Sequence, residues 1–175
     1  MSVVPPEHGW WKQSFPREER MWFSIAIVWA LVMFIMMPLW HVYGKQNPST
    51  ETYKVTPADF QKDVDAFIAK YKVGEEKGVP VVAPPPGSDI YLLAKQWSWS
   101  PVLKLKKGVT YRLHLSSIDV LHGFSLYPLS INFMVIPDYE YVLTITPTQA
   151  GEYYVVCNEY CGLGHQQMVG KIIVE

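Results

Sequence analysis

Twenty consecutive residues of this chain, 21–40, carry no charged side chain. A helix of that length is roughly 30 Å long, at about 1.5 Å per residue, which is enough to cross the hydrocarbon core of a bilayer. Trp22 and Trp40 lie near the two ends of the run, and tryptophan side chains favour the membrane–water interface. Because the remaining chain is too small to bury such a helix on all sides, we expect residues 21–41 to form a transmembrane helix in contact with lipid.

The charges that flank this run predict its orientation. Lys12, Arg17 and Arg20 precede it closely, whereas only Lys45 follows it closely. Positive residues favour the cytoplasmic side, so we expect residues 1–20 to be cytoplasmic and the C-terminal domain to be periplasmic or extracellular. The run is longer than the apolar region of a signal peptide and no A-x-A cleavage site follows it, which indicates a single-pass protein of the cell (inner) membrane.

The net charge and the cysteine count argue against some classes of protein. The chain has 175 residues, of which 49% are hydrophobic, and its net charge is −1. Proteins that bind nucleic acid carry basic patches, so this balance gives no support to a nucleic-acid partner. The chain has two cysteines, which argues against a disulfide-stabilised scaffold. We therefore expect one globular domain beyond the membrane helix.

Residues 42–88 are expected to form a linker that contains one short helix. Thr56 followed by Pro57 is typical of a helix N-terminus, because threonine caps the first turn and proline is tolerated at its first position. The residues that follow include apolar side chains at helical spacing, namely Phe60, Val64, Phe67, Ile68 and Tyr71. This spacing predicts a helix that packs one face against the domain.

From residue 89 to the C-terminus the pattern is typical of short strands. In residues 109–116 apolar and polar side chains alternate, which indicates a strand with one buried face. His114 falls on the polar face and is expected to be a surface residue. Further strands are expected at residues 139–145, 151–157 and 169–174. Seven or eight short strands in all predict a β-sandwich or Greek-key barrel over residues 89–175.

The two cysteines of the chain, Cys157 and Cys161, stand four residues apart, with His165 four residues further on and Met168 three after that. Thiolate, imidazole and thioether ligands together select copper over hard cations. A short disulfide or a tetrahedral zinc site would also fit part of this pattern, but neither gives Met168 a role. A single copper ion would need one cysteine, whereas two thiolates in one turn can bridge two copper ions.

A second histidine is needed from elsewhere, and His122 is the best candidate. The loop reads C-x-E-x-C-G-x-G-H-x-x-M, and D-V-x-H-G-F precedes it at residues 119–124. Together with the segment Gln96-Trp97-Ser98-Trp99, these motifs resemble the dinuclear copper (CuA) domain of subunit II of the haem–copper oxidases. The resemblance covers residues 90–175, and the single membrane helix resembles the shorter, B-type form. It implies a cupredoxin-like, all-β Greek-key sandwich or barrel anchored by one N-terminal transmembrane helix.

The resemblance implies six copper ligands: His122, Cys157, Glu159, Cys161, His165 and Met168. The two cysteines would bridge both ions. His122 and Met168 would complete one copper, and His165 with the backbone carbonyl of Glu159 would complete the other. The resemblance also implies a magnesium ion bound through the Glu159 side chain at the interface with subunit I.

The family has an aromatic side chain through which electrons reach the copper. Trp97 matches that position best and Trp99 is the alternative, although core packing is the usual role of two tryptophans at this spacing. Asp119, three residues before His122, is either a hydrogen-bond partner of that histidine or a turn residue, and we favour the turn.

The function implied by the resemblance is that of subunit II in a terminal haem–copper oxidase. The chain would accept single electrons from cytochrome c or a small copper protein and pass them, through His165, to a haem in subunit I. Subunit I, which also carries CuB, would reduce O2 to water and pump protons, so no catalytic residue is expected in this chain. Three alternatives stay open: the equivalent subunit of a nitric oxide reductase, a membrane-tethered copper carrier, and a structural subunit with a disulfide between the two cysteines.

Overall fold

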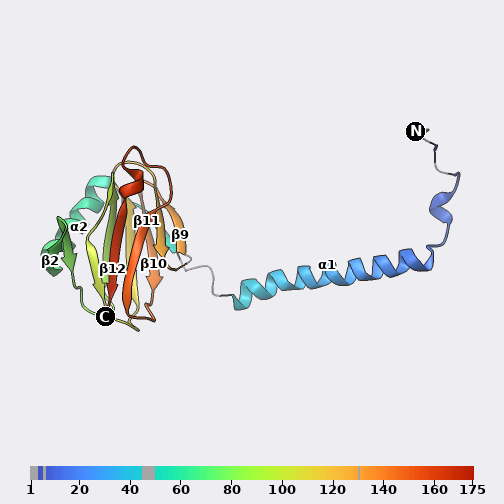
Figure 1. Ribbon diagram of the computed structural model, residues 1–175, viewed down its shortest axis with the longest axis horizontal. Helices are drawn as coiled ribbons and strands as arrows, with labels where there is room; N and C mark the ends of the chain where they lie inside the picture. The colour runs from blue at the N-terminus through green and yellow to red at the C-terminus, as the bar shows by residue number, and fades with distance from the viewer. Residues whose placement is uncertain (1–3, 6, 45–49, 130) are drawn as a thin grey trace. The chain divides into compact units, whose positions relative to one another are not determined.

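The computed structural model describes residues 4–5, 7–44, 50–129 and 131–175. The chain divides into two units, Met1–Asn47 and Pro48–Glu175 (Figure 1). Lys45, on which the charge argument partly depends, lies outside the described residues.

The first unit consists mainly of the helix α1, Arg17–Tyr43, preceded by a 3-10 turn, η1, at Trp10–Lys12. α1 has 27 residues, and at about 1.5 Å per residue it is roughly 40 Å long. Its apolar side chains lie on all faces and none is buried within the protein, so lipid is the environment that can cover them. Among the described residues it is the one helix long and apolar enough to cross a membrane.

α1 is longer than the apolar run from which it was predicted. It begins at Arg17 and its first turn contains Glu18 and Glu19, whose negative charges interact favourably with the positive end of the helix dipole. Pro38 lies inside the helix without ending it. The helix ends where the amide of Gly44 donates to the carbonyl of Trp40 at 2.8 Å. Charged residues therefore extend the helix beyond the hydrocarbon-spanning part.

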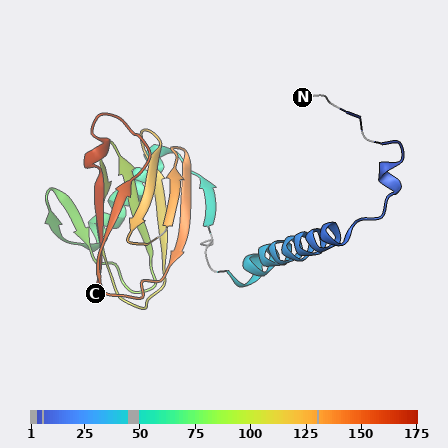
Figure 2. The ribbon, with the colours of Figure 1, turned by 45° about the vertical axis from the view of Figure 1, so that its right-hand side comes forward.

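The second unit contains, in its described residues, the helix α2 at Pro57–Tyr71, the 3-10 turn η2 at His165–Gln167, and strands β1 Thr50–Lys54, β2 Lys72–Glu76, β3 Val79–Val82, β4 Asp89–Lys95, β5 Ser98–Ser100, β6 Val102–Leu105, β7 Tyr111–Ser117, β8 His122–Tyr127, β9 Ile131–Val135, β10 Tyr139–Ile145, β11 Gly151–Cys157 and β12 Val169–Val174. The strands form a five-stranded sheet in the order β1-β10-β7-β4-β5 and a seven-stranded sheet in the order β2-β3-β6-β12-β11-β8-β9. Figure 2 shows the strands of this unit gathered into one layered body.

The core lies between the two sheets, as the alternation of side chains predicted. The first sheet contributes Leu92, Leu113, Leu115 and Leu143 to one buried cluster, and the second contributes Leu103, Phe124, Leu126, Val155 and Ile172. Neighbours in each sheet are often distant in sequence, and the β4–β7, β3–β6 and β6–β12 pairs are parallel. The predicted β-sandwich is therefore confirmed. Many consecutive strands lie in different sheets, so the chain passes repeatedly from one sheet to the other.

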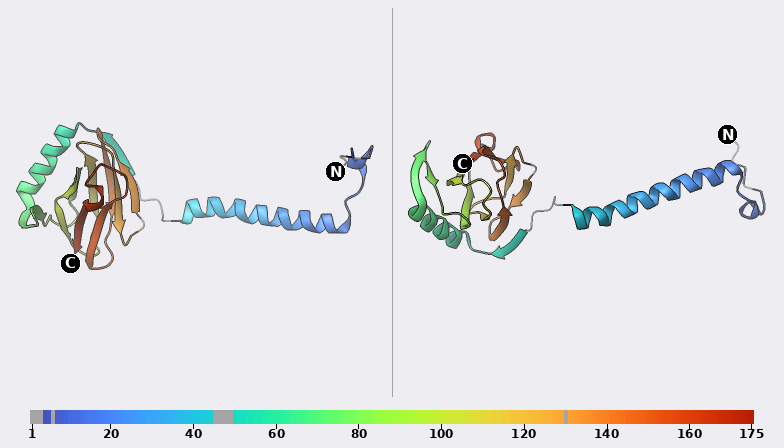
Figure 3. Two further views of the ribbon diagram at one scale, coloured as in Figure 1. Left: turned by 45° about the horizontal axis from the view of Figure 1, so that its top comes forward. Right: turned by 90° about the horizontal axis from the view of Figure 1, so that it is seen from below.

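The predicted helix is α2, and it covers one side of the sandwich (Figure 3, left). The Thr56 side chain accepts a hydrogen bond from the amide of Asp59 at 3.2 Å, which caps the first turn. Phe60, Val64 and Phe67 are the buried face of the helix. Phe60 and Val64 pack against Leu93 of β4. Both faces of β4 are thus buried, one against the other sheet and one against α2.

Three strands lie within the segment described above as a linker. β1 pairs antiparallel with β10, and β3 pairs in parallel with β6, so both sheets extend into this segment. β2 has the sequence KVGEE, which shows no alternation of apolar and polar residues. Edge strands of this kind are stabilised by ladder hydrogen bonds to a neighbour more than by burial, which is why their sequence carries a weak signal.

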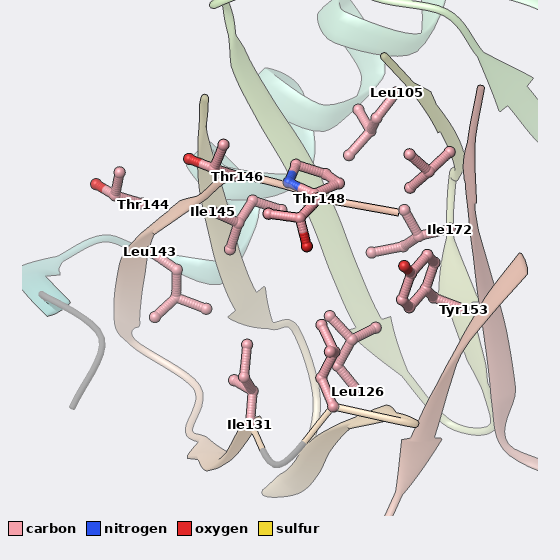
Figure 4. Close-up of a pocket in the computed structure, with 13 residues that line it drawn as sticks. Leu105, Leu126, Ile131, Leu143, Thr144, Ile145, Thr146, Thr148, Tyr153 and Ile172 are labelled. Carbon is pink, nitrogen blue, oxygen red and sulfur yellow. The ribbon is translucent and has the colours of Figure 1, made fainter. Parts of the chain in front are cut away.

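An apolar pocket of about 220 Å³ is lined by residues of both sheets (Figure 4). Leu105, Leu143, Ile172 and Val174 are among the residues that line it. Among the described residues, no charged side chain lines the pocket, and the metal-ligand candidates are not part of it. The pocket is therefore a feature separate from the candidate site.

Candidate metal centre

Three connections meet at the end of the sandwich away from the C-terminus. The β7–β8 connection leads to His122, the β11–β12 loop runs from Cys157 to Met168, and the β4–β5 turn carries Gln96 and Trp97. Figure 1 shows the β11–β12 loop, in red, at this end. The sandwich therefore brings together candidate residues that lie far apart in the sequence.

Strand pairing holds the β11–β12 loop at its base. The two strands are antiparallel with Val156 opposite Val169, and the amide of Cys157 donates to the carbonyl of Met168 at 3.1 Å. On its other side β11 pairs with β8, whose first residue is His122. Cys157, Met168 and His122 are therefore held at the ends of three neighbouring strands, and the ladder hydrogen bonds limit how far they move.

The thiol groups of the two cysteines lie at the centre of a cluster of donor atoms. The Sγ atoms of Cys157 and Cys161 are 3.7 Å apart. Cys157 Sγ is 3.8 Å from Nδ1 of His122 and 3.2 Å from the backbone carbonyl oxygen of Glu159. One sulfur atom thus contacts both the distant histidine and the carbonyl expected from the motif.

The sulfur of Cys161 contacts the remaining candidates. It lies 3.6 Å from Nδ1 of His165 and 3.7 Å from Sδ of Met168. The η2 turn places these two side chains, since the amide of Met168 donates to the carbonyl of His165 at 3.1 Å. The structure therefore brings the six residues proposed as ligands into one cluster.

The spacing of these atoms fits a metal site. Ligands at about 2.0–2.3 Å from a metal ion in a tetrahedral arrangement lie about 3.3–3.8 Å from one another. In the part of the chain that the structure describes, His122, Cys157 and Cys161 are the one group of three His, Cys, Asp or Glu side chains with all donor atoms within 4.8 Å. Sulfur and imidazole donors suit copper better than a hard cation.

Both cysteines are free thiols. Their separation of 3.7 Å is far beyond a disulfide bond of about 2.05 Å, so the arrangement is not that of the disulfide alternative. Burial raises the pKa of the Cys161 thiol to about 11, and the hydrogen-bond interaction with Cys157 and the negative charge of the Cys157 thiolate contribute to the rise. Without metal, Cys161 therefore keeps its proton at neutral pH, and a metal ion that binds the thiolate displaces that proton.

Exposure differs among the six residues. His122 and Met168 are fully buried and both cysteines are nearly so. His165 is half-buried, and Glu159 is exposed. The donors are therefore shielded from water on the side of the core and open to the surface at His165 and Glu159.

Asp119 is both a turn residue and a partner of His122, so our preference for the turn alone was incomplete. Its Oδ1 atom accepts from the amide of Val120 at 2.7 Å, and it lies 2.8 Å from Nε2 of His122. Burial opposes ionisation of Asp119, but hydrogen bonds from the backbone of Gln96, from His122 and from Val120 outweigh it and hold its pKa below the usual value. When Nε2 donates to this carboxylate, Nδ1 is free to bind a metal.

Two glycines make room for the Trp97 side chain. Gly162 has φ of 117°, a conformation that L side chains rarely adopt. A Cβ added at Gly164 would overlap the indole of Trp97. The two glycines of the C-G-x-G-H motif allow a tight loop, and Gly164 also permits close packing of the indole.

The two tryptophans have different environments. Trp97 lies in the β4–β5 turn, is 41% exposed, and donates from Nε1 to the carbonyl of Cys161 at 3.3 Å. Trp99 lies in β5, is 2% exposed, and packs edge-on against His122 with ring centroids 6.3 Å apart. They do not share one exposed face, because the turn ends between them.

His114 is not the free surface residue expected from the alternation. Its side chain is 12% exposed and lies between Glu140 and Asp89, with Nε2 at 3.3 Å from the Asp89 carboxylate. Its ring stacks on Tyr91 at 4.6 Å between centroids. The neighbouring strand β10 and the Tyr91 ring cover a face that was expected to be open, and His114 takes no part in the donor cluster.

Sequence reasoning assigned no role to Gln96 or Gly123. Gln96 donates from its side chain to the carbonyl of Cys161 at 2.7 Å. A Cβ at Gly123 would overlap the side chain of Asn158 and the backbone of Glu159. Gln96 directly precedes Trp97 and Gly123 directly follows His122. This adjacency to candidate site residues was the signal from which a role for them could have been predicted.

Comparisons with known proteins agree with this arrangement. The family model described as "Cytochrome C oxidase subunit II, periplasmic domain" matches residues 98–175. A "Cytochrome c oxidase subunit 2" from Thermus thermophilus is 30% identical over 156 residues, covering 87% of this chain and 88% of that protein. A second protein of that name, also from Thermus thermophilus, is 32% identical over 130 residues, covering 73% of this chain and 96% of that protein.

A chain from the cryo-EM structure of a heme-copper terminal oxidase dimer has a similar fold. The TM-score is 0.57 at 24% sequence identity, and the match covers 91% of this chain and 100% of that one. The cupredoxin-like, mostly β fold with one N-terminal apolar helix is thereby confirmed. This chain belongs to the cytochrome c oxidase subunit II family: it is a membrane-anchored subunit of a haem–copper terminal oxidase, an oxidoreductase complex, with a periplasmic domain whose fold and family imply copper.

Proposed function

We propose that the donor cluster holds a dinuclear copper centre of the CuA type. Cys157 and Cys161 bridge the two ions, His122 and Met168 complete one of them, and His165 with the carbonyl of Glu159 completes the other, which makes six ligands in all. The observation that carries this proposal is the convergence of these atoms on two thiol sulfurs at 3.2–3.8 Å.

Bound copper supplies a one-electron redox couple, and the protein around it limits rearrangement between oxidation states. His122 and Met168 are fully buried and stand at the ends of ladder-paired strands. Asp119 fixes the ring of His122 from the far side. Ligands held in this way cannot follow a change in preferred geometry, which suits transfer of electrons rather than delivery of metal. A copper carrier needs accessible and exchangeable thiols, so the burial of both cysteines argues against that alternative.

We propose that electrons enter at Trp97 from cytochrome c or a small copper protein. The indole is 41% exposed and is joined by a hydrogen bond to the carbonyl of Cys161. Tyr160 and Leu163, in the same loop as Cys161, are 75% and 86% exposed. From residue 45 onward the chain has twelve Lys or Arg and thirteen Asp or Glu, so an apolar docking patch is favoured over strong charge steering.

His165 is the proposed exit for electrons toward the haem of subunit I. It is half-buried, with Nδ1 facing Cys161 and its ring 5.9 Å from that of Tyr160. Subunit I would carry CuB, reduce O2 to water and pump protons, and it would decide whether O2 or nitric oxide is the final acceptor. The exposed Glu159 side chain stays a prediction for magnesium, which would need further ligands from that partner.

We also propose an orientation in the membrane. Lys12, Arg17 and Arg20 place residues 1–20 in the cytoplasm, residues 21–41 cross the lipid, and residues 42–88 lead to the copper domain at 89–175 on the periplasmic or extracellular side. A cysteine introduced at Ser14 should be labelled by a membrane-impermeant maleimide only after cells are opened. Labelling of that cysteine in intact cells would contradict this orientation and favour the opposite one.

The copper proposal is tested on the full-length chain purified in detergent and loaded with copper. Two copper ions per chain, with one unpaired electron shared equally between them in the electron paramagnetic resonance spectrum, is the expected result. Cys157→Ser should abolish that spectrum, whereas Ser125→Ala on β8 should leave it intact. One copper per chain, or a zinc ion in preference to copper, would refute the dinuclear centre.

A further inference from the structure

The β4–β5 turn contacts both loops of the donor cluster. The turn consists of Gln96 and Trp97, between β4 and β5. One loop is the β7–β8 connection, which contains Asp119 and leads to His122. The other is the β11–β12 loop, which contains Cys161. The turn supplies no donor atom to the cluster, so its contacts call for a separate explanation.

Toward the first loop, the contact runs through the backbone of Gln96. Its amide donates to Oδ2 of Asp119 at 2.6 Å, and Oδ1 of the same carboxylate lies 2.8 Å from Nε2 of His122. The residues Gln96 and Asp119 are 23 positions apart. The turn therefore fixes the carboxylate that orients the buried histidine.

Toward the second loop, the contact runs through side chains. Nε2 of Gln96 donates to the carbonyl of Cys161 at 2.7 Å, and Nε1 of Trp97 donates to the same oxygen at 3.3 Å. A carbonyl oxygen has two lone pairs, and these two hydrogen bonds occupy both of them. The peptide plane after Cys161 is thus held from outside the loop, immediately before Gly162 with its φ of 117°.

Few other hydrogen bonds hold the middle of this loop. The amide of His165 donates to Gly162 at 3.1 Å, which is a contact within the loop, and the amide of Cys157 donates to Met168 at its base. Among the described residues, the bonds from Gln96 and Trp97 are the hydrogen bonds that join residues 159–164 to a part of the chain outside residues 157–168. Gln96 makes the shorter of the two.

We propose that Gln96 is a positioning residue of the metal centre, which holds the Cys161 carbonyl and thereby keeps the β11–β12 loop in its ligand geometry before metal binds. This role rests on the proposed copper function for its effect on copper retention. The order of the metal-free loop, which is measured first, does not depend on copper. A loop that is already ordered loses less conformational freedom when it binds a ligand. Loss of one neutral hydrogen bond should therefore weaken copper retention by about three- to tenfold.

Three variants of the full-length chain separate the hydrogen bond from simple packing. Gln96→Leu keeps the size of the side chain and removes its donor. Gln96→Glu keeps the shape but replaces the donor with an acceptor that repels the Cys161 carbonyl. Gln167→Leu is the matched control, because Gln167 lies in the same loop and its side chain is exposed.

Two measurements are made on each variant. Hydrogen exchange of the metal-free chain, followed by mass spectrometry, reports the order of residues 159–164 without any copper. The rate at which copper-loaded chain loses metal to an excess of chelator reports retention. We expect both rates to rise in the order wild type, Gln96→Leu, Gln96→Glu, with Gln167→Leu equal to wild type.

The outcomes are distinct. If Gln96→Glu behaves as wild type, or if Gln96→Leu leaves exchange in residues 159–164 unchanged, the positioning role is overturned. If exchange rises throughout the β-domain, Gln96 stabilises the fold in general and the local role is equally overturned. If exchange rises in the loop as expected but no variant binds two copper ions, the positioning role stands and the copper proposal fails.

Discussion

Nε2 of His122 lies 2.8 Å from Oδ1 of Asp119, and the carboxylate also accepts hydrogen bonds from the backbone amides of Gln96 and Val120. The buried histidine therefore presents Nδ1, not Nε2, to the cysteine sulfur 3.8 Å away. A carboxylate in this position fixes the tautomer and the orientation of a metal-binding imidazole.

Replacement of Asp119 should loosen the metal centre. We expect Asp119→Ala to weaken copper binding by about 10- to 100-fold, because the imidazole loses its partner and can rotate. Competition with a chelator of known affinity measures the change. Asp63→Ala, on the exposed side of α2, is the control and should bind copper as wild type does. Equal affinity of the Asp119 variant and wild type would contradict the orienting role.

Gly164→Ala should disturb Trp97 rather than the copper ligands. The new Cβ would overlap the indole, and the strain should cost about 1–3 kcal/mol of unfolding free energy as Trp97 is displaced. Urea unfolding measures the stability. Gly74→Ala is the matched control, because a Cβ there has open space and the backbone has no positive φ. A stability loss equal in both variants would show that the packing of Trp97 on Gly164 is unimportant.

Trp97→Phe should slow the arrival of electrons without changing the copper centre. The substitution removes the indole N–H that bonds to the Cys161 carbonyl and shrinks the exposed ring. Stopped-flow reduction of the copper-loaded chain by reduced cytochrome c gives the rate, and the paramagnetic resonance spectrum checks the centre. Tyr127→Phe, at an exposed position on β8, is the control. An unchanged rate in Trp97→Phe would place the donor elsewhere.

The Lys171–Glu76 ion pair should make stability depend on acid pH. Lys171 Nζ lies 2.6 Å from Glu76 Oε1, and this hydrogen bond lowers the pKa of Glu76 in the folded chain. A lowered pKa stabilises the fold above the pKa of the unfolded chain, and that contribution is lost as pH falls through the folded value. Glu76→Gln should therefore be less stable than wild type near pH 7, and the difference should shrink as the pH falls below about 4, toward and through the lowered pKa of Glu76.

Urea unfolding of the metal-free chain at both pH values checks this sign. Lys171→Met removes the partner and should abolish the same difference between the two pH values. A destabilisation by Glu76→Gln that persists undiminished at low pH would mean that the ion pair does not cause it.

The elements predicted best are those with local signals. α1 follows from an uncharged run of twenty residues, and α2 from its Thr56 cap and apolar spacing. The same holds for the loop from Cys157 to Met168, where five of the six proposed ligands lie within twelve residues. Strands β1 to β3 were not predicted, because β1 and β3 pair with strands that are remote in the sequence and β2 shows no alternation of apolar and polar residues.

Local patterns along the chain were thus enough to predict the membrane helix and the main strands of the β-sandwich, and the spacing of Cys157, Cys161, His165 and Met168 indicated a soft metal. The full ligand set, with His122, was implied by the resemblance to the CuA domain. Tertiary structure alone decided which tryptophan is exposed, that Asp119 faces His122 as well as forming a turn, and that Gln96 reaches the carbonyl of Cys161. The last contact joins residues 65 positions apart. Such a contact depends on how two loops dock after the sheets have formed, and no periodicity in the sequence records it.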